Sequence, residues 1–168
     1  MIHATGWQGL LALSETLGVD VGRGEKGQAL LLDHAAPVGA PQIFADGLHI
    51  VPHGDGAIAV GSTSERHFED PEGTDAAADA LFDRAVAVMP SLADARITAR
   101  WAGVRPRAAS RAPLLGPYPG KPGVFIANGG FKIGFGIAWG VADLMADLVL
   151  DGHDAIPDAF RLEACLGK

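Results

Sequence analysis

The sequence predicts an α+β fold in which a mixed, largely antiparallel sheet, formed within residues 27–127, is flanked by helices. Its 168 residues include 23 glycines and 11 prolines, a content typical of many turns and strands rather than of a helical bundle. Short apolar runs separated by glycine-rich turns indicate strands, and apolar residues at spacings of three and four indicate helices.

The overall composition argues against several classes of protein. A hydrophobic content of 48% without charge runs argues against disorder, and a net charge of −7 argues against nucleic acid or an anionic membrane as a partner. The single cysteine, Cys165, excludes an intrachain disulfide and a cysteine zinc site. No signal peptide is evident, and no apolar run reaches the roughly 18 to 20 residues that a membrane span needs. We therefore expect a soluble, cytoplasmic protein.

The first 33 residues are predicted to form a strand, a helix and a second strand. Residues 1–6 resemble the end of a buried strand that enters a glycine turn, and Trp7–Leu17 forms a short helix closed by Gly18. The run from Gly22 to Gly27 spells G-x-G-x-x-G. A dinucleotide-binding motif needs a strand before it and a crossover helix after it, and residues 28–33 are too short for that helix. We therefore predict a strand at residues 27–33.

Residues 43–63 are predicted to form a hairpin. Its arms are Leu48–Pro52 and Ala57–Gly61, joined by a turn at residues 53–56. His49 and His53 lie on this segment and His67 follows it, but their spacing matches no standard zinc pattern. We interpret them as solvated histidines and predict no metal site. Residues 64–74 form a polar loop.

An amphipathic helix at residues 75–89, ended by Pro90, precedes a strand at 95–105 and a cluster of three arginines. One interpretation of Arg105, Arg107 and Arg111 is a solvated basic loop. In the other, Arg105 is held near a buried surface by the apolar residues around it. Its guanidinium could there bind a carboxylate through two parallel hydrogen bonds.

The segment from residue 124 to 150 is predicted to form a strand, a glycine-rich turn and an apolar helix. Asn128, Gly129 and Gly130 end the strand, and Gly134 and Gly136 are expected to bracket a second change of direction. Backbone N–H groups of the turn and the positive end of the helix dipole would receive an anion or a dipole. The apolar surroundings suit a flat ring system. The alternative is a turn that serves packing only. A last helix is predicted at 154–165.

Six short stretches occur in this order: Ala4–Gly6, Lys26–Gln28, Val60–Thr63 with Glu65, Trp101–Pro106, Pro113–Gly116 and Ala127–Gly134. Together they resemble the C-terminal half of the FAD-dependent D-amino-acid oxidase family, which includes glycine oxidase, sarcosine oxidase and D-amino-acid dehydrogenases. The resemblance covers nearly the whole chain. It implies a substrate-binding domain at residues 19–123 and segments of an FAD-binding domain at 1–18 and 124–168.

The resemblance also implies roles for individual residues. Arg105 would hold the carboxylate of an amine or amino-acid substrate, and Lys132 would reach the same substrate. Non-covalent FAD would contact Thr5, Gly6, Gly129, Gly130, Phe131, Lys132, Ile133, Gly134, Phe135 and Gly136. The expected reaction is oxidation of the substrate by hydride transfer to the flavin, with an imine as the product.

The sequence departs from the family at several points. Gly130 stands where some relatives have histidine, Lys132 replaces an arginine, and Cys165 lies far from the glycine-rich turn, so covalent flavin is not expected. The dinucleotide-binding strand, turn and helix with which family members begin are not found. We therefore expect a chain that is inactive by itself, or alternatively a non-catalytic binding or assembly domain without flavin. Apolar surface on residues 1–18 and 124–150, including Leu10, Leu13, Val141 and Leu144, is expected to be exposed and to favour self-association or binding of an N-terminal cofactor domain.

Overall fold

The structure is a computed structural model that describes residues 1–37, 39–54 and 56–166. It contains two compact units: the terminal unit, Met1–Glu25 with Arg105–Lys168, and the central unit, Lys26–Val104. The boundaries fall inside two long strands, β2 (Gly22–Asp33) and β6 (Arg96–Ala108), and not after residues 18 and 123. A strand that continues past a boundary produces no local change in composition, so the sequence held no signal for it. The cofactor and substrate roles of the two parts stay predictions.

The terminal unit is built on a three-stranded sheet with the order β1-β8-β7. Its strands are β1 (Ile2–His3), β7 (Leu114–Pro117) and β8 (Phe125–Asn128). β1 pairs with β8 in parallel and β7 pairs with β8 antiparallel. The predicted α+β class is confirmed, but the prediction of one sheet over residues 27–127 is wrong, because β7 and β8 belong to a second sheet, in which β8 pairs with the N-terminal strand.

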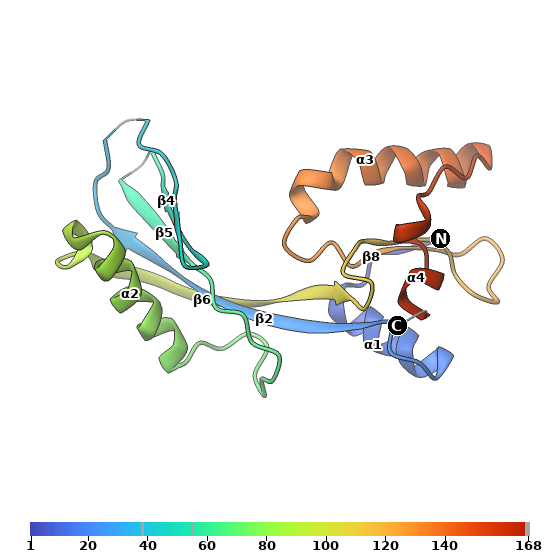
Figure 1. Ribbon diagram of the computed structural model, residues 1–168, viewed down its shortest axis with the longest axis horizontal. Coiled ribbons are helices and arrows are strands. Elements are labelled where there is room, and N and C mark those ends of the chain that lie inside the picture. Colours follow the sequence, from blue (N-terminus) through green and yellow to red (C-terminus); the bar gives the residue numbers. More distant parts are fainter. Residues whose placement is uncertain (38, 55, 167–168) are drawn as a thin grey trace. The chain divides into compact units, whose positions relative to one another are not determined.

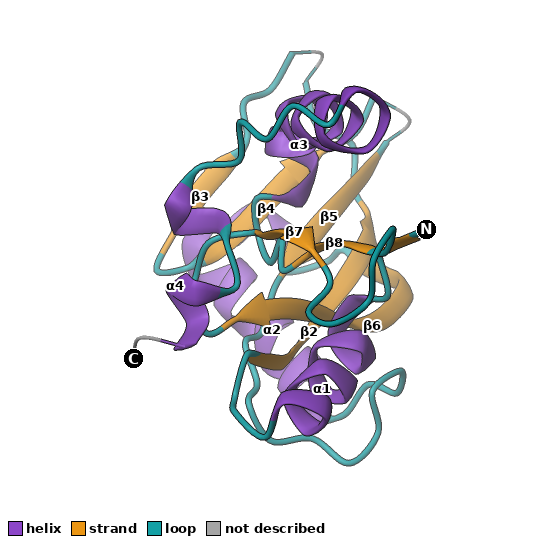
Figure 2. Cartoon of the chain, turned by 90° about the vertical axis from the view of Figure 1, so that its right-hand side faces the viewer, coloured by secondary structure: helices purple, strands orange, loops and turns teal. Residues whose placement is uncertain are grey.

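Helices α1 (Gly6–Leu17) and α3 (Gly134–Ala146) lie on opposite faces of this sheet (Figures 1 and 2). Successive residues of a strand point to opposite faces, so β7 supplies a residue to each side. Leu114 belongs to the core formed with α1, and Leu115 belongs to the core formed with Met145 of α3. The sheet therefore separates two apolar layers, each closed by one helix.

Two expectations for the N-terminal segment are wrong. Ile2 is 46% exposed and does not lie in a buried strand, because β1 is the edge strand of its sheet. Leu10 and Leu13 are buried against Val21 and Ala108, so they leave no apolar surface open. The predicted end of the helix is confirmed, with Gly18 in the left-handed conformation at φ +66°.

Residues 154–165 do not form the predicted single helix. They contain two short pieces, η3 (Asp158–Phe160) and α4 (Glu163–Leu166). Arg161 donates two hydrogen bonds of 2.9 Å to the Asp154 carboxylate, and these hold the segment in a loop. Cys165 lies within α4 and is 3% exposed, because it packs into the same core as Leu10.

The central unit is a five-stranded sheet with the order β3-β4-β5-β2-β6 and a helix, α2 (Ala76–Val88), whose core residues pack with those of the strands. The strands β4 (Leu48–Pro52) and β5 (Ala57–Gly61) confirm the predicted hairpin, and β3 (Ile43–Ala45) extends it. Asp55 of the predicted turn lies outside the described residues. The G-x-G-x-x-G sequence, Gly22–Gly27, lies within strand β2. It therefore does not form the turn between a strand and a helix that a dinucleotide-binding motif needs.

The core of this unit combines alternate residues of the strands with one stripe of α2. Leu30 and Leu32 of β2 contribute together with Leu81 and Ala85 of the helix. The helix begins after Asp75, whose side chain accepts a hydrogen bond of 2.9 Å from the backbone N–H of Ala77. A short helix η1 (Pro90–Leu92) follows, because Pro90 cannot continue α2.

A buried amide joins three segments of the central unit. Gln28, which is fully buried, donates from Nε2 to the carboxylates of Asp75 (2.9 Å) and Glu65 (3.1 Å). Its Oε1 accepts from the backbone N–H of Asp75 at 2.9 Å. The backbone N–H of Gln28 donates to Thr63 Oγ1 at 2.8 Å. One side chain thus fixes the start of α2 and the loop after β5 to strand β2.

This network makes the free energy of unfolding depend on pH in the acid range. The hydrogen bond from Gln28, followed by that from Ala77, holds the pKa of Asp75 below its ordinary value. A lowered pKa in the folded state stabilises the fold above the unfolded-state value of about 3.9, and this contribution is lost as pH falls through the folded-state pKa. Asp75→Asn keeps a capping side chain but no ionisable group, so urea unfolding should show a shallower loss of stability below about pH 4 than the wild type. Asp94→Asn, at an exposed loop position, should leave the wild-type acid dependence intact.

The apolar residues of α3 divide into an inner and an outer face. Val141, Leu144 and Met145 pack toward the sheet. Val141 and Leu144 were expected to be exposed, but both are half-buried. Phe135, Trp139 and Leu150 are 101%, 84% and 78% exposed. Leu150 lies in a π-helical extension, Asp147–Asp151.

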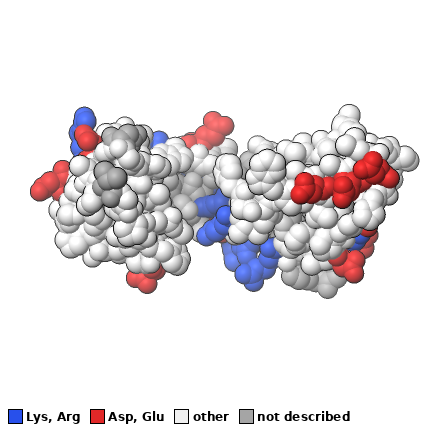
Figure 3. All heavy atoms as spheres, turned by 90° about the horizontal axis from the view of Figure 1, so that it is seen from above, with Lys and Arg blue, Asp and Glu red and all other residues white. Residues whose placement is uncertain are grey.

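Acidic side chains form a row on the right-hand part of the face shown in Figure 3. Among the described helices, none is both long and apolar enough to cross a bilayer.

We predict that this outer face drives self-association of the isolated chain, because large exposed apolar side chains gain free energy when they leave water. Trp139→Lys should therefore reduce the concentration-dependent increase in molecular mass measured by light scattering. Trp101→Lys is the matched control, because Trp101 is also exposed, at 45%, but lies outside α3. Equal effects of both substitutions would mean that α3 has no special part in association.

Candidate functional site

The glycine-rich turn after β8 is fixed by side-chain and backbone contacts. Asn128 donates from Nδ2 to the Gly6 carbonyl at 2.8 Å, and its Oδ1 accepts from the backbone N–H of Gly129 at 2.8 Å. Gly129 has φ +75°, and a Cβ there would lie 3.0 Å from the Cβ of Ala108. A side chain at this position would therefore strain both the backbone and the packing against Ala108. The contact also brings Thr5 and Gly6, two predicted cofactor residues, next to the turn.

The second change of direction occurs at Phe131 and not between Gly134 and Gly136. Phe131 has φ +44°, its N–H donates to the Pro106 carbonyl at 3.1 Å, and Gly130 forms an antiparallel bridge with Arg107. The N–H of Ile133 donates to the Gly130 carbonyl at 3.0 Å, and α3 begins at Gly134. Pairing with a strand distant in sequence places the bend at a phenylalanine, which local glycine content cannot indicate.

The N-terminus of α3 has no side-chain cap. Its N-cap residue is Ile133, and its first turn contains no acidic residue. Gly134, Phe135 and Gly136 are exposed. Backbone N–H groups in the first turn of a helix lack intrahelical acceptors, and the helix dipole adds partial positive charge. An uncapped first turn of this kind attracts negative charge, and the assignment of Gly134, Phe135 and Gly136 to the cofactor stays a prediction.

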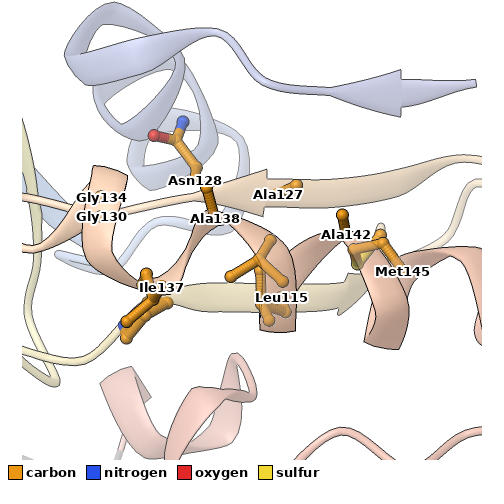
Figure 4. A pocket seen from close by; sticks show the side chains of 11 residues that line it. Leu115, Ala127, Asn128, Gly130, Gly134, Ile137, Ala138, Ala142 and Met145 are labelled. Atoms are coloured by element: carbon orange, nitrogen blue, oxygen red, sulfur yellow. The ribbon is translucent and has the colours of Figure 1, made fainter.

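An apolar cavity of about 350 Å³ lies between α3 and strands β7 and β8 (Figure 4). Asn128 is the only polar residue among those that line it, which are Pro113, Leu115, Ala127, Asn128, Gly130, Gly134, Ile137, Ala138, Val141, Ala142 and Met145. The turn glycines Gly130 and Gly134 belong to its wall. Such a surface offers water few hydrogen-bond partners on one side of the turn.

Three cationic side chains surround the ring of Phe131. The Cζ atoms of Arg105 and Arg107 lie 6.0 and 5.2 Å from the ring centroid, and the Nζ of Lys132 lies 5.5 Å from it. These distances are within cation–π range. The structure thus brings the two predicted substrate residues, Arg105 and Lys132, to one side chain that was predicted to contact the cofactor.

The interpretation of the arginines as a solvated basic loop is wrong for two of the three. Arg105 and Arg107 lie in β6 and are half-buried, and Arg107 donates to Glu25 at 2.6 Å. Arg111 alone is exposed. The sequence analysis did not include Glu25 and did not separate Arg107 from Arg111. The spacing of Arg105 and Arg107 was an available signal, because residues two apart in a strand lie on the same face.

The three histidines considered for a metal site, His49, His53 and His67, are exposed. His49 Nδ1 lies 2.8 Å from the side-chain nitrogen of Gln42, and its ring centroid lies 4.5 Å from that of Phe44. Within the described ranges, no group of three or more histidine, cysteine, aspartate or glutamate side chains is arranged to hold a metal ion.

The structure defines an α+β protein in which a glycine-rich turn, an uncapped helix N-terminus and an apolar cavity lie together, with three cationic side chains close by. Residues 1–148 match the sequence profile of the FAD dependent oxidoreductase family. The chain belongs to this family.

Individual relatives agree with this assignment. The chain is 37% identical over 109 residues to a glycine oxidase of Pseudomonas aeruginosa, which covers 65% of this chain and 30% of the relative. It is 34% identical over 135 residues to a glycine oxidase of Pseudomonas putida, and this match covers 80% of this chain and 36% of the relative. The crystal structure of glycine oxidase from Geobacillus kaustophilus superposes with a TM-score of 0.84 at 27% identity, covering 96% of this chain and 44% of that one. The chain thus spans about a third of the length of the curated relatives it matches.

Proposed function

We propose that this chain supplies the flavin edge and the substrate-carboxylate site of an FAD-dependent oxidoreductase that oxidises an amine or amino acid. The observation that carries the proposal is that Arg105 of β6 and Lys132 both lie against the ring of Phe131, and that Phe131 and Lys132 come just before the uncapped N-terminus of α3. Family membership and the two glycine oxidase relatives support it.

The residues present fit the ring end of FAD. The first turn of α3 has no protein cap and no carboxylate, and the wall beside it is apolar, as a ring with a polar edge requires. Gly129–Gly136 would hold the ring, with Thr5 and Gly6 close to the turn. When bound, the cofactor supplies the acceptor for a hydride from the substrate carbon.

Each side chain then has a definite task. Arg105 binds the substrate carboxylate and so orients the carbon that loses hydride, which is a matter of positioning and not of proton transfer. Lys132 adds a point charge, without the fixed fork of an arginine, so it tolerates more than one position of the carboxylate. The N–H groups of Gly134, Phe135 and Gly136 would face a bound ring and would stabilise negative charge on it.

A second candidate function, a non-catalytic assembly domain, is favoured by the exposed Phe135 and Trp139. Titration of the ¹⁵N-labelled chain with FAD separates the two. The proposed function predicts FAD-dependent shifts of the amide resonances of Gly129–Gly136, whereas an assembly domain predicts none. Binding should be weak, with FAD lost on dialysis, because the G-x-G-x-x-G letters of this chain lie in strand β2 and cradle no pyrophosphate. Shifts confined to other residues, or no shifts at millimolar FAD, would overturn the proposal.

A further inference from the structure

The Glu25–Arg107 pair is the most buried ion pair among the described residues. The Arg107 side chain is 16% exposed and that of Glu25 is 7% exposed, and Arg107 Nη1 donates to Glu25 Oε2 at 2.6 Å. The pair joins β2 to β6. The same two strands are joined by the Asp33–Arg96 pair at 3.0 Å, with side chains 58% and 76% exposed. Burial removes a charge from water, so the chain keeps Arg107 inside only with a carboxylate partner.

Arg107 also contacts the turn through both its backbone and its side chain. Its backbone bridges Gly130, and its guanidinium carbon lies closer to the Phe131 ring, at 5.2 Å, than the cationic groups of Arg105 and Lys132. Phe131 has a left-handed conformation, φ +44°, which residues other than glycine rarely adopt. A strained residue of this kind persists only where its surroundings hold it.

We infer that Arg107, locked by Glu25, is a positioning residue that holds Phe131 in this conformation and thereby aims Lys132 and the first N–H groups of α3 at the ligand. Arg107 does not itself touch the ligand. Because Lys132 follows Phe131 directly and α3 starts at Gly134, a change in φ at Phe131 would redirect both. The inference rests on the proposed function for its ligand, but the geometry of the turn can be tested separately.

The test uses the ¹⁵N-labelled chain with Glu25→Gln and Arg107→Lys, and Asp33→Asn as the matched control between the same two strands. The first readout is hydrogen exchange of the Phe131 amide, which bonds to the Pro106 carbonyl. We expect exchange at least about tenfold faster in Glu25→Gln and Arg107→Lys, but within about twofold of the wild type in Asp33→Asn. The second readout is the FAD-induced shift of the Lys132, Ile133 and Gly134 amides, which should shrink only in the first two variants.

Arg107→Lys distinguishes positioning from simple stabilisation. Lysine keeps a charge for Glu25 but cannot lay a planar group on the ring. If lysine restores wild-type exchange and wild-type shifts, the ring contact has no positioning role and the inference is wrong. Phe131→Leu provides a second variant that leaves the buried pair intact, and it should likewise reduce the shifts at Lys132 and Gly134. Unchanged shifts in that variant would also overturn the inference. If FAD shifts no turn amide in the wild type, the proposed function fails, while the exchange comparison still decides whether Arg107 holds the turn.

Discussion

Replacement of Arg105 by alanine should lower kcat/KM by about two to three and a half decades, or roughly 3 to 5 kcal/mol, in a catalytically complete enzyme. The test uses a fusion of this chain to the N-terminal part of the Pseudomonas putida glycine oxidase, one of its relatives, and the unsubstituted fusion provides the reference activity. The loss is large because the substrate carboxylate would be left without its bidentate partner in a site shielded from water. Steady-state kinetics with an amino-acid substrate measure it. Arg105→Lys should recover only part of the rate, because an ammonium group lacks the planar fork.

The structure decides which arginine is a suitable control. Arg111 is exposed in a turn, so Arg111→Ala should change kcat/KM by less than about tenfold. Arg107 is not a surface charge, and Arg107→Ala would leave Glu25 without the Arg107 hydrogen bond, so it is expected to lower stability and is unsuitable for this comparison. Small and equal effects of Arg105→Ala and Arg111→Ala would end the assignment of Arg105 to the substrate.

Substitution of Gln28 by leucine should reduce the free energy of unfolding by about 2 to 5 kcal/mol. Leucine has a similar volume but leaves the backbone N–H of Asp75 without its acceptor and removes the amide shared by the Asp75 and Glu65 carboxylates. Two negative groups would then face each other without the donor between them. Urea unfolding at neutral pH measures the loss.

Gln42→Leu provides the matched control for this prediction. Gln42 also forms a side-chain hydrogen bond, with His49 at 2.8 Å, but both residues are exposed. Water can replace the lost bond there, so the change in stability should stay within about 0.5 kcal/mol. Similar losses for both glutamines would show that the buried network contributes no more than a surface contact.

Local sequence determined the elements whose signals lie within a few residues. The arms of the hairpin β4–β5 are as predicted, because alternating apolar residues and a glycine-containing turn specify them without distant partners. Helix α2 starts after Asp75 and ends before Pro90, as capping and proline sterics require. The order of six short motifs also determined the FAD-dependent family, which the match over residues 1–148 confirms.

Only the tertiary structure decided which segments pair and which charges are buried. Strands β7 and β8 join β1, more than a hundred residues away along the chain, and no local pattern encodes such a partner. Arg107 differs from Arg111 because Glu25 lies opposite it on β2, and the turn bends at Phe131 because Pro106 accepts its N–H. The sequence alone thus determined the glycine-rich turn and its family, whereas long-range strand pairing determined the direction in which that turn presents Lys132 and the start of α3. The physical reason is that periodicity and capping act over one or two turns of chain, while strand pairing and buried ion pairs depend on residues brought together only by folding.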